Sequence, residues 1–347
     1  MQNTADNINN RTLLVFNCHE AWVYQLGVLG LPLDIIVGLK GRHKQYWDEQ
    51  IRPIPDNSRF ITLSEALHTQ SQYYCIITHN ITDLLDVKHR NEPRLIVIHS
   101  TLEGRHIEEK SCVDLVKMKT NLHKYLELVG GHAVAGSLLK GKSWDFTEDV
   151  VVVGCDPGDY PPYSGQKACG LRICNHINSR KKILLWDFHN KAFAGLPVQL
   201  VGHNPDMQGV TASNNWGHLK ELLQSHRFYI HTADPKLEDG YNMACIEAMA
   251  AGTPVVGNQH PTSPVEHGVS GFLSDDPDEL RRYATLLLQD RNLAIKMGRE
   301  ARNTVTKCFS MEKFKKSFLN SIETARMKWH NKMATYSNEI VTHSNNS

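Results

Sequence analysis

Two acidic residues in the second half of the chain have types and spacing suited to holding a sugar nucleotide. Asp239 lies in a glycine-containing turn, and Glu247 follows eight positions later inside a short helical stretch. A turn that opens a helix leaves backbone N–H groups pointing outward, where they can bind an anion such as a diphosphate. A carboxylate further along the helix can accept hydrogen bonds from a pair of sugar hydroxyls. The alternative is that Glu247 is a solvated acid on an amphipathic helix, because Glu is a good helix former.

The segments around the second acid predict a strand–helix–strand unit that would position both carboxylates. Asn242 is a suitable N-cap for a helix over 243–251, whose residues are mostly strong helix formers. Gly252 then suits a left-handed C-cap. Short apolar strands are predicted on both sides, at 228–231 and 253–256. Ligands of such sheets bind at the carboxyl ends of the strands, and the loop that carries the first acid follows one of those ends.

Residues 228–310 resemble the E-x7-E region of the retaining GT-B glycosyltransferases of the family-4 type (glycosyl transferases group 1). In that family an acid-Gly-aromatic sequence opens the motif and Glu-Ala-Met-Ala closes it, as 239–241 and 247–250 do here. The similarity continues in register through 252–256 and 267–273. A terminal pattern also fits, at Gly298, Ala301, Arg302 and Phe309.

Two positions depart from the family pattern. The first acid is Asp239 where the family has Glu, unless the neighbouring Glu238 takes its place. Ser263 stands where the family often has a further Glu. The first departure bears on the reaction, because the shorter side chain of Asp239 changes the reach of its carboxylate.

The resemblance implies a fold and a reaction. The fold would be α/β of the GT-B type, with two Rossmann-like domains whose parallel sheets face an interdomain cleft. The reaction would move a sugar from a nucleotide-sugar donor to an acceptor, with retention of anomeric configuration and without a metal, as in a hexosyltransferase or a related transferase of glycan biosynthesis. No cofactor is expected, because the nucleotide-sugar is itself the donor substrate. The acceptor would be a glycan, a lipid-linked molecule or a small molecule.

The resemblance also assigns roles to the residues of the motif. Glu247 would hold the ribose hydroxyls of the donor. Asp239 would be catalytic, hydrogen-bonding the donor sugar near the reacting centre. The departing diphosphate would be stabilised by the backbone amides of the turn, those of Gly240, Tyr241, Asn242 and Met243.

A basic loop at 175–182 is a second candidate for phosphate binding. In the resembled enzymes this loop supplies an Arg and then a Lys to the phosphates. Asn175 stands at the Arg position, Lys181 fits the Lys position best, and Arg180 can compensate. We predict a helix over 181–191, so the cluster would be either an anion site or a solvated basic helix start.

Five residues of the first half are candidates for the site because they follow predicted strands. His99 follows the apolar run 95–98, and in similar enzymes a catalytic His in such a place contacts the donor sugar. The alternative is a structural hydrogen-bonding His. His19 and Glu20 follow the run 13–16, His79 and Asn80 follow the fourth predicted strand, and such loops border the acceptor in this architecture.

The sequence predicts no metal site. Asp276-Pro277-Asp278 has the D-x-D form of metal-dependent glycosyltransferases, but it stands just before a predicted helix, where N-capping explains it better. The 8 cysteines are scattered without a C-x-x-C pair, and none of the 19 histidines forms a zinc-type spacing with them. Buried thiols in a reducing cytosol explain the cysteines better than disulfides.

Composition narrows the class of partner and the compartment. A net charge of +1 over 347 residues argues against a general nucleic-acid binder, whose phosphate contacts need a basic excess. No run of 18 apolar residues occurs, so we expect no transmembrane segment, although peripheral membrane contact stays open. The polar N-terminus lacks the apolar region of a secretory signal. A cytoplasmic location is therefore expected.

Alternating apolar runs and helical stretches predict two α/β domains joined by a Pro/Gly-rich segment. The predicted parts are a disordered lead-in (1–11), an acceptor-side Rossmann-like domain (12–153), a linker (154–166), a nucleotide-sugar-binding Rossmann-like domain (167–309), a helix that crosses to the first domain (310–328) and a polar tail (329–347).

Other functions on the same scaffold stay open. A catalytically altered binding protein is favoured by the Asn at the Arg position and by Asp239. A nucleotide-sugar epimerase is also compatible with the scaffold, whereas a phosphorylase would need a much longer chain. A nicotinamide dehydrogenase is disfavoured because no G-x-G-x-x-G follows a predicted strand.

Overall fold

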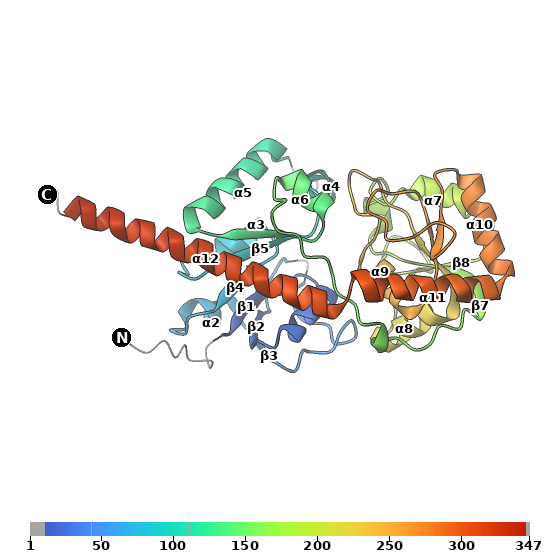
Figure 1. Ribbon diagram of the computed structural model, residues 1–347, viewed down its shortest axis with the longest axis horizontal. Helices are drawn as coiled ribbons and strands as arrows, with labels where there is room; N and C mark the ends of the chain where they lie inside the picture. Colours follow the sequence, from blue (N-terminus) through green and yellow to red (C-terminus); the bar gives the residue numbers. More distant parts are fainter. Residues whose placement is uncertain (1–10, 43, 110–111, 345–347) are drawn as a thin grey trace. The chain divides into compact units, whose positions relative to one another are not determined.

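The computed structural model describes residues 11–42, 44–109 and 112–344, and the chain forms two compact units (Figure 1). The first unit takes the chain up to His99, then Val113–Val151 and the residues from Lys315 onward. The second unit takes Ser100–Cys112 and Val152–Phe314. The predicted lead-in lies outside the described residues, apart from Arg11.

The first unit is built on a six-stranded parallel sheet with the order β3-β2-β1-β4-β5-β6. Its strands are the short apolar runs of the sequence, and most of their residues are buried because helices cover both faces of such sheets. Strand order reverses between β1 and β4, the switch point at which doubly wound sheets bind ligands. The strands are β1 Leu13–Phe16, β2 Leu33–Ile36, β3 Ser58–Ile61, β4 Cys75–Thr78, β5 Arg94–Ile98 and β6 His132–Ala135.

The helices of the first unit show the expected apolar spacing and caps. In α5 (Leu115–Val129), Met118, Leu122 and Leu126 are buried at four-residue intervals, and Gly130 ends the helix with φ 62°. The remaining helices are α1 Glu20–Tyr24, η2 Gln25–Leu29, α2 Leu63–His68, α3 Ile81–Asp86, α6 Leu138–Trp144 and most of α12 Met311–Ser344.

Helix α12 is longer than predicted. The sequence predicts a helix that ends at 328 and a polar tail over 329–347, whereas the helix continues to Ser344. The extension packs on the end of α5, where a Cβ at Gly130 would lie 2.9 Å from Trp329 Cα. The Tyr336 hydroxyl donates to the Leu128 carbonyl at 3.1 Å. These tertiary contacts stabilise a polar stretch whose sequence alone carries no apolar stripe.

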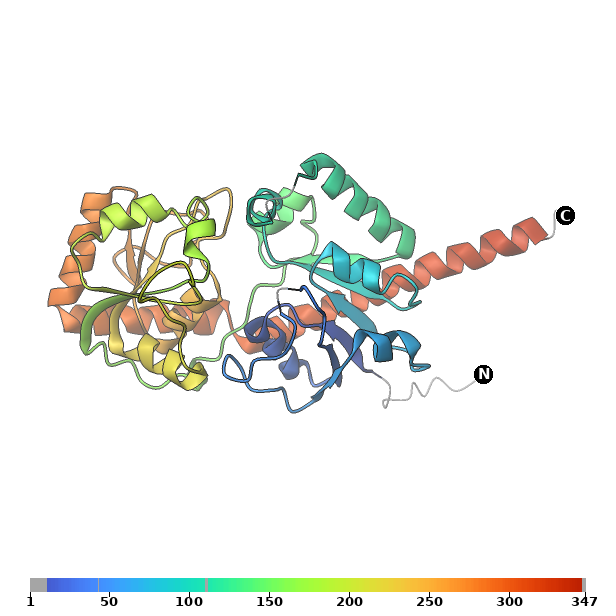
Figure 2. The ribbon, with the colours of Figure 1, turned by 180° about the vertical axis from the view of Figure 1, so that it is seen from behind.

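The second unit contains a five-stranded parallel sheet with the order β11-β10-β9-β7-β8. Helices α8, α9 and α11 pack together, and α7 packs with α10 (Figures 1 and 2). The strands are β7 Lys167–Ile173, β8 Val198–Val201, β9 His226–His231, β10 Val255–Gly257 and β11 Gly271–Leu273. The helices are α4 Leu102–Glu108, η3 Pro157–Asp159, η4 Ile177–Ser179, α7 Trp186–Ala192, α8 Trp216–Ser225, α9 Met243–Ala251, α10 Pro277–Gln289 and α11 Arg291–Cys308.

Helix α4 belongs to the second unit, although the predicted boundary places it in the first domain. The Thr101 hydroxyl donates to the Leu237 carbonyl at 2.7 Å. Gly104 permits this approach, because a Cβ there would lie 2.6 Å from the same carbonyl oxygen. The contact is long-range in sequence, so no local pattern could have assigned α4 to the unit that carries the acidic motif.

No helix among the described residues has both the length and the apolar character needed to cross a bilayer.

Candidate functional site

The acidic motif folds as the sequence predicts. Helix α9 begins at Met243, with Asn242 as N-cap: the Asn242 side-chain oxygen accepts a hydrogen bond from Cys245 N at 2.8 Å. Gly252 ends the helix in the left-handed region, with φ 86°. Strands β9 and β10, on either side of α9 in sequence, pair in parallel. The turn before α9 therefore stands at the carboxyl end of β9, where an open α/β sheet binds its ligands.

Glu247 is buried inside α9 rather than solvated. Its side chain is 6% exposed, and the Tyr160 hydroxyl donates to its Oε1 at 3.1 Å. This geometry argues against the reading of Glu247 as a surface acid, since a buried carboxylate needs a partner. Tyr160 fixes one oxygen of the carboxylate.

Sequence reasoning missed Tyr160 because it lies in the segment predicted to be a linker. That segment is instead part of the second unit, where Tyr160 is 5% exposed and packs in the core with Cys155. The available signal in the sequence was an aromatic residue between prolines and glycines. The density of Pro and Gly favoured a linker instead.

Asp239 is fully buried in the turn before α9. Thr262 contacts Asp239 through its hydroxyl, with Oγ1 at 3.4 Å from Asp239 Oδ1. The same hydroxyl oxygen accepts a hydrogen bond from Gly240 N at 2.8 Å. Gly240 is required here, because a Cβ would lie 2.7 Å from Ser263 N and 2.8 Å from the His260 ring. The loop after β10 thus holds the acid turn in place.

His260 helps to set this turn. Its Nε2 lies 3.0 Å from the Glu238 carbonyl, so Nε2 carries the proton, and its Nδ1 accepts from Thr262 N at 3.1 Å. The tautomer is assigned from these two partners. Neither His260 nor Thr262 was predicted, because no pattern in the sequence connects the loop after β10 with the turn before α9.

Glu238, the alternative first acid, has structural partners. Its Oε1 accepts a hydrogen bond from Asp239 N at 3.0 Å, and its Oε2 lies 3.7 Å from the Arg180 guanidinium. Arg180 also pairs with Glu108 of α4 at 2.7 Å. Burial lowers the pKa of Arg180, but Glu108 and Glu238 outweigh it, so the pKa is raised. The structure therefore places Arg180 beside the acid turn, with its charge balanced by two carboxylates.

The predicted helix over 181–191 is wrong in its first turn. The chain runs through η4 and a series of turns, Leu185 takes a left-handed φ of 48°, and α7 begins only at Trp186. Lys181 is exposed and precedes the helix, so it does not stand at a helix N-terminus. Its role at the phosphates stays a prediction.

A buried arginine of strand β7 lies in the same unit. Arg172 in β7 is 3% exposed, and its guanidinium donates to Thr232 Oγ1 at 2.9 Å and to the Leu184 carbonyl at 3.0 Å. It also lies over the Trp186 ring, at 5.3 Å from the ring centroid. Burial lowers the pKa of Arg172. These partners are neutral, so Arg172 adds positive charge near the carboxyl end of β7.

His99 lies in the first unit, in contact with two residues from other strands. Its Nε2 is 2.8 Å from His79 Nδ1 and 3.9 Å from Cys18 Sγ. Burial lowers the pKa of His79 to about 3, against a smaller opposing influence of the Phe16 carbonyl, so the His79 ring is neutral at physiological pH. The predicted contact of His99 with a donor sugar stays a prediction.

Two of the acceptor-side candidates have local roles in the first unit. Glu20 is fully buried, pairs with Lys44 Nζ at 2.9 Å and accepts from Asp48 N at 3.3 Å. His19 is the N-cap residue of α1 without a side-chain capping bond. A contact of either residue with an acceptor stays a prediction.

The D-x-D sequence caps a helix, as predicted. Asp276 is the N-cap of α10, and its carboxylate accepts from Asp278 N at 2.8 Å and from Glu279 N at 3.4 Å. Pro277 occupies the first turn. This capping explains the motif without a metal.

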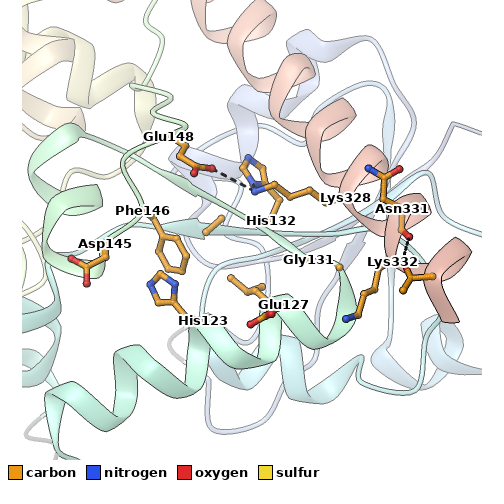
Figure 3. A pocket seen from close by; sticks show the side chains of 14 residues that line it. His123, Glu127, Gly131, His132, Asp145, Phe146, Glu148, Lys328, Asn331 and Lys332 are labelled. Carbon is orange, nitrogen blue, oxygen red and sulfur yellow. Dashed lines mark hydrogen bonds and ion pairs between the residues drawn. The ribbon is translucent and has the colours of Figure 1, made fainter. Parts of the chain in front are cut away.

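A groove of about 610 Å³ lies in the first unit, between the end of α5, the start of β6 and α12 (Figure 3). His132 at its wall contacts Asp149 at 2.8 Å and the Lys328 ammonium at 3.1 Å. Lys328 also lies 3.7 Å from Glu148. None of the predicted site residues lines this groove.

A protein-family model matches the segment that contains the acidic motif. Residues 203–304, which include Asp239 and Glu247, match the family model described as Glycosyl transferases group 1. No curated protein matches the chain.

Solved structures of glycosyltransferases share the fold. HepE of Anabaena in complex with UDP and glucose is 14% identical, with a TM-score of 0.62 over 91% of this chain and 100% of that one. Sucrose-phosphate synthase from Thermosynechococcus elongatus is 13% identical, with a TM-score of 0.60 over 96% of this chain and 100% of that one. TarM from S. aureus is 14% identical, with a TM-score of 0.54 over 72% of this chain. The chain spans only 55% of the length of TarM.

The similarity to these structures concerns the fold, and the family match concerns one segment of the second unit. The chain therefore has the GT-B fold, and its residues 203–304 match the model of the glycosyl transferases group 1 family.

Proposed function

We propose that the protein is a glycosyltransferase that takes its sugar from a nucleotide-sugar donor bound at α9 of the second unit. The observation that supports this best is the buried carboxylate of Glu247, which Tyr160 holds at 3.1 Å inside the segment that matches the family model. Glu247 lies just over one turn into α9, Tyr160 holds its Oε1, and a carboxylate in such a place can accept hydrogen bonds from ribose hydroxyls.

The other residues of the second unit suggest how transfer would proceed. Charge develops on the diphosphate as the glycosidic bond breaks, and preorganised donors stabilise that charge. The amides at the start of α9 supply such donors, and Lys181 and the buried Arg172 supply positive charge. Arg180 contributes only in competition with Glu108 and Glu238. Asp239, held by Thr262 in the turn, would contact the donor sugar. In this proposal transfer needs no metal and retains the anomeric configuration, as the family resemblance implies.

UDP-sugars are the first donors to test, because HepE was solved in complex with UDP and glucose. The assay below identifies the sugar and the base of the donor, and the acceptor.

A binding protein without turnover is the second candidate. It is favoured by the balanced charge of Arg180, which pairs with both Glu108 and Glu238. Two carboxylates on this guanidinium compete with a phosphate for its donors, and Asn175 leaves the usual Arg position neutral. The epimerase alternative would change the donor sugar without transferring it.

The test begins with thermal unfolding of the full chain in the presence of UDP, GDP, ADP and their sugars. A ligand present at about 100 times its Kd stabilises the native state by about 2.7 kcal/mol, so the correct base raises Tm measurably. We expect Glu247→Gln to abolish that rise and Glu266→Gln, an exposed acid of the same unit, to keep it. If the rise survives Glu247→Gln, the ribose assignment is wrong.

Turnover is then measured by analysing all products of the bound donor with a panel of acceptors. A new glycoside, or release of free sugar by transfer to water, supports the transferase. A changed donor sugar without transfer supports the epimerase, and stable binding with an intact donor supports the binding protein.

A further inference from the structure

Three side chains that commonly bind transition metals meet at one edge of the first unit's sheet. Cys18 comes two residues after β1, His79 directly after β4 and His99 directly after β5. These strands are neighbours and run parallel, so their carboxyl ends lie at the same edge. One ligand atom from each residue lies within 4.8 Å of the other two.

The distances are close to those of a metal site. His99 Nε2 lies 2.8 Å from His79 Nδ1 and 3.9 Å from Cys18 Sγ. A tetrahedral zinc ion, with bonds of about 2.0 Å to nitrogen and about 2.3 Å to sulfur, would set these separations at about 3.3 Å and about 3.5 Å. His79 Nδ1 and His99 Nε2 would therefore have to separate by about 0.5 Å, and Cys18 Sγ and His99 Nε2 to approach by about 0.4 Å.

The surroundings hold the two imidazole rings in place. Trp22, which is 7% exposed, packs edge-on against His79 and His99, with ring centroids at 4.9 Å and 5.0 Å. The backbone N–H of His79 donates to Asp83 Oδ2 at 2.9 Å, which fixes the start of the loop after β4. His79 is 6% exposed, and its Nε2 has no hydrogen-bond partner among the described residues. A ring held this way, with its Nδ1 turned toward the other two groups, suits coordination through Nδ1.

The set of donor atoms favours zinc among the common cations. One thiolate and two imidazoles are borderline-soft ligands that Zn²⁺ prefers, whereas Mg²⁺ and Ca²⁺ need oxygen ligands. Three protein ligands leave the fourth tetrahedral position open for water or another small ligand.

We propose that Cys18, His79 and His99 form a zinc-binding site of the first unit. The sequence predicted no metal site, because these ligands come from segments that are far apart in sequence and show no zinc-type spacing. The proposal rests on the geometry of the first unit alone and not on the glycosyltransferase function. It has one consequence for that function: a metal on His99 Nε2 would occupy the ring that the family resemblance assigns to the donor sugar.

Cobalt is the probe, because Co²⁺ replaces Zn²⁺ and is visible by absorption. The full chain is stripped of metal with a chelator, kept reduced, and titrated with Co²⁺. We expect one Co²⁺ per chain, with a thiolate-to-cobalt charge-transfer band and the strong visible bands of tetrahedral cobalt. Zn²⁺ should displace the Co²⁺ and bleach both sets of bands.

Variants locate the ligands. Cys18→Ser should remove the charge-transfer band, and His79→Gln should weaken Co²⁺ binding by at least about tenfold while retaining the band. Cys112→Ser, which removes an exposed thiol outside the cluster, is the matched control and should bind Co²⁺ as the unmodified chain does.

The proposal is overturned if the unmodified chain shows no thiolate band. It is equally overturned if the band persists in Cys18→Ser or disappears in Cys112→Ser. The cobalt spectrum of the unmodified chain tests the proposal even if a variant fails to fold. The shift of Tm by UDP, measured on the same samples, reports the donor site separately: losing that shift while the cobalt spectrum is intact would contradict the proposed function and leave the zinc site standing.

Discussion

The hydrogen bond between Tyr160 and Glu247 is the contact on which the proposed donor site depends most directly. The bond fixes one carboxylate oxygen, and it thereby sets the orientation of the other oxygen. A carboxylate that must hold two ribose hydroxyls loses affinity when it can rotate, because its ordering then costs entropy on binding. Tyr160 is therefore expected to act as a positioning residue for Glu247.

Replacing Tyr160 with Phe removes the hydroxyl donor while keeping the ring in the core. We expect the affinity for the donor nucleotide to fall about tenfold, and the free energy of unfolding to fall by about 1 kcal/mol through loss of a buried hydrogen bond. Isothermal titration calorimetry with the nucleoside diphosphate measures the change in affinity.

Tyr163→Phe is the matched control for that experiment. Its hydroxyl donates to the Arg227 carbonyl at 2.8 Å, in the same segment but away from Glu247. The Tyr163→Phe variant should lose a similar free energy of unfolding, and its affinity for the nucleotide should stay unchanged. Equal losses of affinity in both variants would show that the effect of Tyr160 is a general loss of stability.

The two neighbouring acids Glu238 and Asp239 are separable by substitution. Asp239→Asn keeps the shape of a fully buried side chain but removes the charge, and we expect turnover to fall about a hundredfold while donor affinity changes little. Glu238→Gln can still accept from Asp239 N, so it should keep most of its turnover. Steady-state kinetics on the identified donor decides, and the reverse ranking would identify Glu238 as the reacting acid.

At the scale of single elements, α4 supports the acid turn through a close backbone contact. Gly104 lies against the Leu237 carbonyl, two residues before Asp239. Helix α4 also supplies Glu108 to Arg180. The element is thus a brace for the turn, and its effect on the site should exceed what its short length suggests.

The substitution Gly104→Ala tests this role. Its Cβ would lie 2.6 Å from the Leu237 oxygen, so α4 or the turn must shift, at a cost of about 1–3 kcal/mol. We expect a lower Tm together with weaker donor binding. Gly217→Ala in α8, whose added Cβ would lie 3.1 Å from the Asn215 side chain, should leave both nearly unchanged. If the Gly104→Ala variant has a normal Tm and normal donor binding, α4 does not support the acid turn.

Strand β9 confers a pH dependence on stability. His226 is fully buried at its start, and burial lowers its pKa to about 4, against an opposing hydrogen bond with the Leu222 carbonyl. The unfolded chain binds a proton at about pH 6.5, whereas the folded chain does not until about pH 4. The stability that His226 contributes is therefore complete above about pH 6.5 and is lost as the pH falls toward 4.

This predicts that the free energy of unfolding falls between pH 7 and pH 5, by about 2 kcal/mol from His226 alone. Urea titrations at the two pH values measure the change. His226→Gln should lower stability at pH 7 but reduce its pH dependence by about that amount. An unchanged slope in the variant would assign the pH dependence to other groups.

At the scale of the whole molecule, the alternation of short apolar runs with helices was enough to predict two parallel α/β units. Parallel strands buried on both faces need continuous apolar sequence, and that requirement is visible locally. Helix α9 with its caps was predictable for the same reason, since an N-cap, a left-handed glycine and the residues between them act within one segment. The segment 203–304 adds the family similarity to this local information.

The assignment of α4 and of the predicted linker to the second unit could not be predicted in this way. Thr101 meets Leu237, and Tyr160 meets Glu247, across more than 80 positions of the chain. Such contacts depend on how the sheet and its helices pack, and no periodicity in the sequence records them. The length of α12 has the same origin, because contacts with α5 stabilise its last turns.

The sequence by itself therefore determined most of the elements, the acidic motif and the kind of ligand that the motif suits, because caps, apolar periods and helix termini are local properties. The start of α7 and the end of α12 are exceptions. Only the tertiary structure decided which partners those residues have: Tyr160 on Glu247, Thr262 beside Asp239, and Cys18 with His79 and His99. The physical reason is that the packing of sheets and helices brings distant residues together whatever their spacing along the chain. For Cys18, His79 and His99, the parallel strands that precede them end at one edge of the sheet.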